Sequence, residues 1–294
     1  MTLYELLKQS KYPDKKTLSQ IITNIYKISQ ADIYTSDVFL TNDEIAKIDE
    51  YYHKVTIEDY PIQYIFGTEK FLDHEFVVDQ NVLIPRAETE YMVKYALWQI
   101  WENAKKNIIS DSLDKYNPVI YDIWTGSGAI WISMAIWLTQ AAIDANINLL
   151  DISDEALTIT KKNLSKLSNQ ISSDIYISVG YSDLLSEVKF DDIWVGHDIY
   201  ILANLPYVDQ SDYIANLNQL RREPKIALVA DDKWLALYYK LLDDILTRSA
   251  LDDKSIYIYL EINDWQYDMI YQKYSDSFAI KYQETWHRHK YIHN

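Results

Sequence analysis

The stretch that decides the fold is residues 121–129, which read Tyr121-Asp122-Ile123-Trp124-Thr125-Gly126-Ser127-Gly128-Ala129. It begins at the end of an apolar strand predicted over 118–123, crosses a turn of small residues and enters a helix predicted over 129–138. In doubly wound folds this first turn is where a ligand meets the helix N-terminus, and glycine lets the backbone approach that ligand closely. The alternative is a turn that merely connects the two elements.

Strand and helix patterns alternate on both sides of this turn. Apolar runs and helical spacing predict further strands at 147–151, 175–179, 199–203 and 255–261, and further helices at 88–101, 154–167 and 235–246. Strands that alternate with helices form a largely parallel sheet covered on both faces. We therefore expect an α/β fold with a doubly wound, mostly parallel sheet.

The residues before this region follow other patterns. Residues 1–70 have apolar side chains at helical spacing, and Thr41-Asn42-Asp43-Glu44 is a capping box that opens a helix. Residues 71–85 carry β-rich runs around Asp79-Gln80-Asn81, as in a hairpin closed by Pro85. The sequence predicts a helical docking domain at 1–70, a β-hairpin connector at 71–85 and a sheet-containing domain at 86–294.

Charge and composition exclude several classes of protein. The 294 residues include 44 acidic and 28 basic side chains, and the net charge of −16 disfavours a protein that grips nucleic acid through its phosphates. The absence of cysteine excludes a thiolate nucleophile and a Cys-ligated metal site. No stretch approaches the roughly 18 apolar residues of a membrane span. We expect a cytoplasmic protein that binds neither membrane nor nucleic acid.

Acidic side chains follow two of the predicted strands. Asp151 closes the strand after the glycine turn, where a carboxylate accepts hydrogen bonds from both hydroxyls of a ribose; a solvated helix cap is the alternative. Asp183, followed by Leu184, comes after the next strand and could accept from an adenine amino group. Both residues are therefore candidates for binding a nucleoside.

Asn204-Leu205-Pro206-Tyr207 follows the apolar strand 199–203. The Asn oxygen and a neighbouring backbone carbonyl can accept the two hydrogens of a planar amide or amino group, while the aromatic ring packs over its face. A proline turn with a buried Tyr is the alternative. The tail histidines His287, His289 and His293 have no carboxylate at ligand spacing, so no metal site is expected.

In this order the motifs resemble the class I methyltransferases that use S-adenosylmethionine, and within them the HemK/PrmC family, the N5-glutamine methyltransferases of peptide chain release factors. The resemblance covers nearly the whole chain, and the IPR-x-ETE segment at 84–90 is its most specific part. The segments that carry it are Pro61-Ile62-Gln63-Tyr64-Ile65-Phe66-Gly67, Val82-Leu83-Ile84-Pro85-Arg86-Ala87-Glu88-Thr89-Glu90, residues 122–128, Asp151-Ile152-Ser153, residues 204–207 and Glu223-Pro224.

The resemblance implies a seven-stranded sheet and a monomer that methylates the side-chain amide nitrogen of the glutamine in the Gly-Gly-Gln loop of a release factor, its protein partner. Around the cofactor S-adenosylmethionine it places Asp122, Trp124, Thr125, Gly126, Ser127, Gly128, Asp151, Asp183, Leu184 and Asn204. Catalysis is assigned to Asn204, Pro206 and Tyr207, and substrate binding to these three with Leu205, Arg86 and Glu88. A second reading, an amino-methyltransferase of DNA or RNA, shares the Asn-x-Pro-Tyr feature.

Two residues depart from the family pattern at the site. Leu205 replaces the first Pro of the usual tetrapeptide, yet it still provides a backbone carbonyl. Trp124 replaces the first Gly of the cofactor turn, where a side chain should clash or force a φ that a bulky residue resists. Trp234 likewise stands where the family has Gly.

The chain has nine Trp and only five Gly, which makes these replacements part of a wider pattern. One hypothesis is that several of these Trp codons are UGA, read as Gly in the source organism, and a UGG codon at position 124 would refute it. The alternative is a degenerate methyltransferase fold with weakened or lost cofactor binding.

Overall fold

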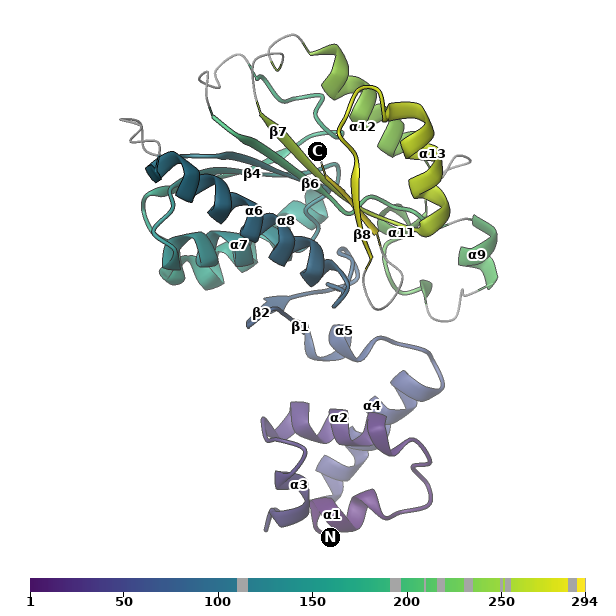
Figure 1. Cartoon of the computed structure of the whole chain (residues 1–294). Coiled ribbons are helices and arrows are strands. Elements are labelled where there is room, and N and C mark those ends of the chain that lie inside the picture. The colour runs from purple at the N-terminus through teal and green to yellow at the C-terminus, as the bar shows by residue number, and fades with distance from the viewer. Residues whose placement is uncertain are drawn as a thin grey trace. The chain divides into compact units, whose positions relative to one another are not determined.

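The computed structural model describes residues 1–109, 116–190, 197–208, 210–215, 220–229, 235–248, 251, 255–284 and 290–293. The chain forms two compact units (Figure 1). Unit 1 comprises residues 1–68 with 217–222, and unit 2 comprises residues 69–216 with 223–294.

Unit 1 is helical. Its helices are α1 (Leu3–Leu7), α2 (Lys15–Tyr26), α3 (Asp32–Thr35), α4 (Asn42–Thr56) and α5 (Ile62–Phe66). The apolar faces of these helices bury a core of their own, with Leu6, Leu18 and Ile48 fully inside it. The predicted capping box is confirmed, because Thr41 Oγ1 accepts from the Glu44 amide and the Glu44 carboxylate accepts from the Thr41 amide.

A β-hairpin follows, and its turn lies elsewhere than predicted. Strands β1 (Thr68–Phe71) and β2 (His74–Val77) pair as a two-stranded sheet. Leu72, at φ 51°, begins the connection between them. The expectation of a hairpin turn around 79–81 was wrong: those residues form a turn in which the Val82 amide bonds to the Asp79 carbonyl, with no strand after it. The apolar run that follows lines the candidate site instead.

The main sheet of unit 2 confirms the predicted fold class. Its parallel strands are β3 (Val119–Ile123), β4 (Ala145–Asp151), β5 (Ile175–Tyr181), β6 (Ile199–Ala203) and β7 (Ile256–Ile262). An antiparallel pair, β8 (Lys281–Glu284) and β9 (Lys290–His293), adds to one edge, and the order among the described strands is β5-β4-β3-β6-β7-β9-β8. Strand order reverses direction between β3 and β6, the place where ligands bind in doubly wound sheets.

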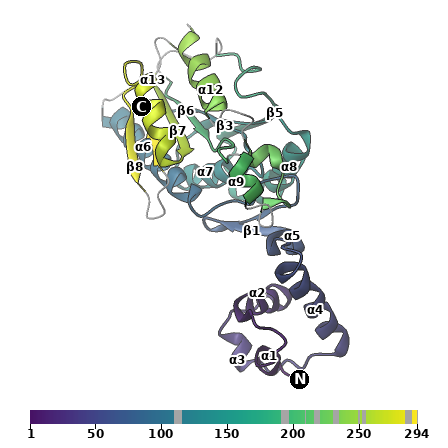
Figure 2. The same cartoon turned by 90° about the vertical axis from the view of Figure 1, so that its right-hand side faces the viewer.

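Helices cover both faces of this sheet (Figure 2). One apolar cluster joins it to α6 (Thr89–Ile109), α7 (Ala129–Gln140) and α8 (Asp154–Leu167). The other cluster joins it to α12 (Ala236–Thr247) and α13 (Asp264–Tyr274). Within β6, Tyr200 faces the first cluster and Ile201 the second, as the two-residue period of a strand requires.

Several elements were not predicted. Helix α6 continues well past residue 101, and α9 (Gln210–Ala215), α11 (Lys225–Leu228), α13, β8 and β9 had no counterpart in the expected pattern. These elements are short, edge-located or weakly periodic, so side-chain spacing alone gives little signal. The residue Trp234 and the tail residues His287 and His289 lie outside the described residues.

Candidate active site

The candidate site lies at the carboxyl ends of β3, β4, β6 and β7, where polar side chains gather beside the strand-order reversal. Two small cavities open there, of about 40 and about 50 Å³. Four residues line both of them: Leu83, Trp124, Gly126 and Asn204. The glycine turn after β3 and the polar end of β6 therefore share one region of space.

The glycine turn is held by hydrogen bonds on both of its sides. The Gly126 amide donates to Asp151 Oδ2 at 2.8 Å, and the Thr125 amide donates to the Leu150 carbonyl at 3.0 Å. From α8, Thr160 Oγ1 donates to the Gly126 carbonyl at 2.7 Å, and Asn163 Nδ2 donates to the Ser127 carbonyl at 2.9 Å. These bonds fix the path of the turn between β3 and α7.

Gly128 ends the turn in a conformation that needs glycine. Its φ is 78°, and a Cβ built there would lie 2.9 Å from Ile132 Cδ1. The left-handed region and the close approach of α7 both disfavour a side chain. This glycine therefore sets the angle at which the chain enters α7.

Two buried carboxylates support the turn. Asp122 is fully buried, and Thr125 Oγ1 donates to its Oδ2 at 2.6 Å. Burial raises the pKa of Asp122 well above its usual range. Burial also raises the pKa of Asp151, against the opposing effect of the Gly126 and Ser153 amides that donate to it. Asp151 therefore holds the turn through the Gly126 amide and also lines the smaller of the two cavities.

Trp124 occupies the left-handed region at φ 64°. A bulky residue rarely adopts this conformation, which costs of order 1 to 3 kcal/mol. Its indole Nε1 is buried, and no described residue accepts its hydrogen. The sequence expectation of a forced φ at this position is confirmed.

The space around Trp124 decides whether a nucleoside ligand fits. Pockets for ligands of that size hold roughly 300 to 1,000 Å³. Here Trp124 lines both cavities, and each is far smaller than that range. The turn and Asp151 place backbone amides and a carboxylate beside these cavities, and the Trp124 indole lines both of them.

Asp183 and Leu184 lie apart from these two cavities, and neither residue lines them. Lys240 Nζ lies 2.5 Å from Asp183 Oδ2 in a half-exposed ion pair. Leu184 is buried, with φ 55°. Their predicted part in adenine binding stays a prediction.

The tetrapeptide 204–207 leads into a buried polar network. Asn204 Nδ2 lies 3.3 Å from Thr89 Oγ1, and Thr89 Oγ1 donates to Glu261 Oε2 at 2.7 Å. The Tyr207 hydroxyl donates to Glu261 Oε1 at 3.3 Å. Segments far apart in the chain, the start of α6 and the ends of β6 and β7, thus meet at one carboxylate.

Tyr238, in α12, connects to the same strand ends. Its buried hydroxyl lies 3.1 Å from the Leu205 carbonyl and 2.8 Å from the Glu261 carbonyl. A hydroxyl has one hydrogen to donate, and each carbonyl has two lone pairs, so the Leu205 carbonyl can still accept a second hydrogen bond. Pro206 is buried beside it, and Tyr207 packs on the α12 side of the sheet.

Arg86 forms the rim of the site together with Glu223. Its Nη2 lies 2.5 Å from Glu223 Oε1, while Glu223 Oε2 accepts from the Ile84 amide at 3.1 Å. Glu223 is buried, so this charged pair fastens the segment before α6 to the segment before α11. Burial raises the pKa of Glu261, and the nearby charge of Glu88 adds to that rise.

Sequence reasoning left Thr89, Glu261, Tyr238 and Asn163 without a role. Thr89 stands inside the quoted 84–90 segment, and Glu261 closes the predicted strand 255–261. The signal for Glu261 in the sequence was a carboxylate at the end of an otherwise apolar strand. Tyr238 and Asn163 look like ordinary helix residues, and only their contacts distinguish them.

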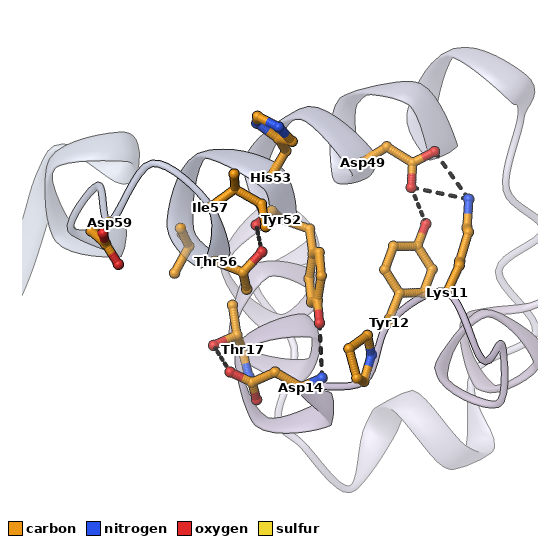
Figure 3. A pocket seen from close by; sticks show the side chains of 12 residues that line it. Lys11, Tyr12, Asp14, Thr17, Asp49, Tyr52, His53, Thr56, Ile57 and Asp59 are labelled. Atoms are coloured by element: carbon orange, nitrogen blue, oxygen red, sulfur yellow. Dashed lines mark hydrogen bonds and ion pairs between the residues drawn. The ribbon is translucent and has the colours of Figure 1, made fainter. Parts of the chain in front are cut away.

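A cavity of about 690 Å³ lies in unit 1, between the loop before α2 and helix α4 (Figure 3). Lys11 Nζ lies 3.0 Å from Asp49, which also accepts from the Tyr12 hydroxyl. The Tyr52 hydroxyl accepts from the Asp14 amide at 2.8 Å. None of the predicted site residues lines it.

Two features are absent from the described part of the chain. No helix there is long and apolar enough to cross a membrane. No group of three or more His, Asp or Glu side chains there could hold a metal ion.

The sheet order, the glycine turn after its first strand and the acidic end of its second define a class I methyltransferase, a class whose cofactor is S-adenosylmethionine. No protein-family model matches the chain. Among relatives, the release factor glutamine methyltransferase of Streptococcus pneumoniae is 31% identical over 86% of this chain and 80% of its own length. That of Enterococcus faecalis is 32% identical over 70% of this chain and 64% of its own. The chain belongs to the release factor glutamine methyltransferase family.

The match to the Enterococcus faecalis relative spans less than two thirds of that relative's length. Among solved structures, the N-terminal domain of human METTL16 in complex with SAH matches 97% of this chain and 96% of its own, with a TM-score of 0.48 and 13% identity.

Proposed function

We propose that this chain transfers the methyl group of S-adenosylmethionine to the side-chain amide nitrogen of the glutamine in the Gly-Gly-Gln loop of a peptide chain release factor. The observation that carries the proposal is the position of Asn204: it lines the same two cavities as the glycine turn, so an amide bound to it would lie beside the cofactor. The relatives, which are release factor glutamine methyltransferases, support the substrate class.

The chemistry asks for acceptors rather than a strong base. An amide nitrogen is a poor nucleophile because its lone pair is delocalised. Hydrogen bonds from its N–H groups to Asn204 Oδ1 and the Leu205 carbonyl would increase the electron density on nitrogen, and Tyr207 would pack over the amide plane. Orientation then supplies much of the remaining reduction in barrier.

When bound, S-adenosylmethionine would supply an electrophilic sulfonium methyl group. Its transfer to the amide nitrogen would form an N–C bond and leave the electron pair of the broken S–C bond on sulfur, and the amide proton would then pass to water. The products would be an N-methyl glutamine, S-adenosylhomocysteine and a proton. We assign the ribose to Asp151, the adenine to Asp183 with Leu184, and the rim that admits the loop to Arg86 with Glu88.

Partners and setting follow from this proposal. The chain would act as a monomer in the cytoplasm, with the release factor as its protein substrate and no direct contact with nucleic acid. The net charge of −16 supports the last point, because an acidic surface repels a polyanion. We assign docking of the release factor to the helical residues 1–70.

A methylation assay tests the proposal. Purified release factor, total tRNA and DNA are each offered with methyl-labelled S-adenosylmethionine to the chain and to its Trp124→Gly variant. We expect label on the release factor, stronger with the variant, and none after the loop glutamine is replaced. Asn204→Ala should abolish transfer, whereas Asn169→Ala, at an exposed position in the 168–170 turn, should not. Label on nucleic acid alone would show a different substrate, and no label from either chain would indicate a degenerate fold.

A further inference from the structure

Glu261 is a buried carboxylate that the proposed reaction does not itself use. It has no exposed surface and lies one residue before the end of β7. Both of its oxygens accept hydrogen bonds from neighbouring elements: Oε2 from the Thr89 hydroxyl at 2.7 Å and Oε1 from the Tyr207 hydroxyl at 3.3 Å. Burying a charged carboxylate is costly unless it is paired and hydrogen-bonded, and here the two hydroxyls offset that cost.

The bond to Thr89 determines how Asn204 is turned. A threonine hydroxyl has one hydrogen, and here it points to Glu261. Its oxygen can therefore only accept from Asn204, which must present Nδ2 at 3.3 Å. This choice leaves Asn204 Oδ1, to which no described residue donates, as the acceptor for a substrate amide hydrogen.

An ionised carboxylate accepts from both hydroxyls at once, one on each oxygen. A glutamine at position 261 would present one acceptor and one donor, so it could not accept from both Thr89 and Tyr207. A protonated Glu261 has the same defect, because its own hydrogen must be donated to one of the two neighbours. After either change, Thr89 and Tyr207 can no longer both donate to residue 261, so the pair of hydrogen bonds that orients Asn204 and the Tyr207 ring is lost as a unit.

Charged and titratable groups from each surrounding segment act on this carboxylate. Burial raises the pKa of Glu261 to about 7, the Thr89 and Tyr207 hydroxyls and Arg86 oppose that rise, and Glu88 adds to it. Tyr238 of α12 donates to the backbone carbonyl of the same residue. The ionisation of Glu261 therefore changes within the range in which an enzyme is assayed.

We propose that Glu261 is a positioning residue for amide methylation: through Thr89 it turns the Asn204 side chain so that Oδ1 faces the substrate, and through Tyr207 it fixes the ring that covers the substrate amide. This inference rests on the proposed function for the identity of the bound amide. The orientation of Asn204 itself is a property of the free protein.

The test compares Glu261→Gln, Thr89→Val, Thr89→Ser and the double variant Glu261→Gln/Thr89→Val, all in the full-length chain carrying Trp124→Gly. Turnover on the release factor is measured from pH 6 to pH 9. We expect Glu261→Gln and Thr89→Val each to lower kcat by roughly 10- to 100-fold, with KM values for both substrates within about twofold. Thr89→Ser keeps the hydroxyl, so its kcat should stay much closer to that of the parent than the kcat of Thr89→Val does. The double variant should be no worse than either single one, because the residues act as a unit.

The pH profile separates positioning from a merely structural role. In the parent, kcat should fall as the pH drops through about 7, and Glu261→Gln should remove that dependence. The matched control is Glu75→Gln, which changes an exposed carboxylate on β2 paired with Lys166. It should leave kcat and its pH profile unchanged.

A second readout does not depend on turnover. In the full-length chain labelled with ¹⁵N-asparagine, the Asn204 side-chain amide signal is identified by its loss in Asn204→Ser. It should shift with a midpoint near pH 7 in the parent and stay constant in Glu261→Gln. A pH-independent Asn204 signal, or a kcat within twofold of the parent in Glu261→Gln, would overturn the proposal. Absence of release factor methylation in every chain would instead refute the proposed function, and the amide signal would still decide the role of Glu261.

Discussion

At the scale of single residues, Trp124 has the greatest effect on the site. The Gly126 amide of the turn donates to Asp151, and the Trp124 indole lines both small cavities beside that turn. Under the proposed function, the hydrogen-bonding groups of the turn suit the ligand, whereas the cavities that Trp124 lines are too small for it. Both hypotheses raised by the sequence, a misread glycine codon and a degenerate fold, predict that removing this side chain restores the space.

Trp124→Gly should increase the affinity for S-adenosylmethionine by roughly 100-fold, because the ligand no longer has to displace a packed aromatic side chain at a cost of about 3 kcal/mol. Titration calorimetry measures the change. Trp98→Gly, at a half-exposed position on α6 that lines neither small cavity, is the matched control and should leave the affinity unchanged. Equal, tight binding by the parent and Trp124→Gly would contradict the steric argument.

Glu261 predicts how stability depends on pH. Its pKa is raised from 4.5 to about 7 by burial, so between these values the folded chain binds more protons at this site than the unfolded chain. The contribution to the free energy of unfolding is therefore fully present below about pH 4.5 and is lost as the pH rises to about 7, a decrease of roughly 3 kcal/mol. Glu261→Gln should lack this decrease.

Urea unfolding at pH 5 and pH 8 measures the effect as the difference between the parent and Glu261→Gln. Asp122 and Asp151, whose pKa values are also raised, contribute equally to both chains and cancel. Glu75→Gln is the control, because its free energy of unfolding should differ from that of the parent by the same amount at both pH values. A difference for Glu261→Gln that is the same at both pH values would show that the carboxylate is not the titrating group.

At the scale of elements, the strands and long helices were predictable because they repeat a pattern over many residues. Strand β6 and helix α8 have the predicted bounds, 199–203 and 154–167. The hairpin was misplaced because residues 76–84 are as β-prone as a strand, although their apolar side chains serve the core and the site. The edge strands β8 and β9 have too few residues for a period to show.

The site was predictable in part for the same reason. Asp151 and Asn204 stand directly after apolar strands, so their place at the sheet edge follows from sequence order. The Thr89 to Glu261 bond joins residues that are 172 positions apart, and no local pattern encodes such a pairing. Nor does spacing reveal that Asp183 would pair with Lys240 away from the two small cavities.

The glycine turn yields a graded prediction for one element. Gly128→Ala should lower the free energy of unfolding by about 2 to 3 kcal/mol, because it combines a left-handed φ with a Cβ 2.9 Å from Ile132. Gly126→Ala has the left-handed φ but open space around it, so about 1 kcal/mol is expected. Gly180→Ala, with ordinary contacts and no such φ, should cost less than about 0.5 kcal/mol. Urea unfolding gives all three values, and an equal loss for all three would rule out the conformational explanation.

At the scale of the whole molecule, the chain contains separate apolar cores. The core of unit 1 shares no residue with the two clusters on the faces of the main sheet. Leu18 is fully buried in the first of these cores. Stability is therefore expected to divide between the two units.

Leu18→Ala should destabilise unit 1 by about 2 to 5 kcal/mol, because it leaves a cavity in a small core. Scanning calorimetry should resolve two transitions, of which this variant shifts only one. In the Trp124→Gly chain, S-adenosylmethionine should raise only the other transition, since a ligand stabilises the unit that binds it. A single transition that both changes shift equally would show that the units unfold together.

The left-handed backbone at Trp124 has an evolutionary consequence. The shape of the turn is imposed by bonds at its neighbours, from the Thr125 and Gly126 amides and from Thr160, and not by the residue at position 124 itself. A substitution at that position can therefore change the space beside the turn while these bonds keep its path. Under the proposed function, one codon change at position 124 would be enough to lose nucleoside binding or to regain it, with no compensating substitution elsewhere.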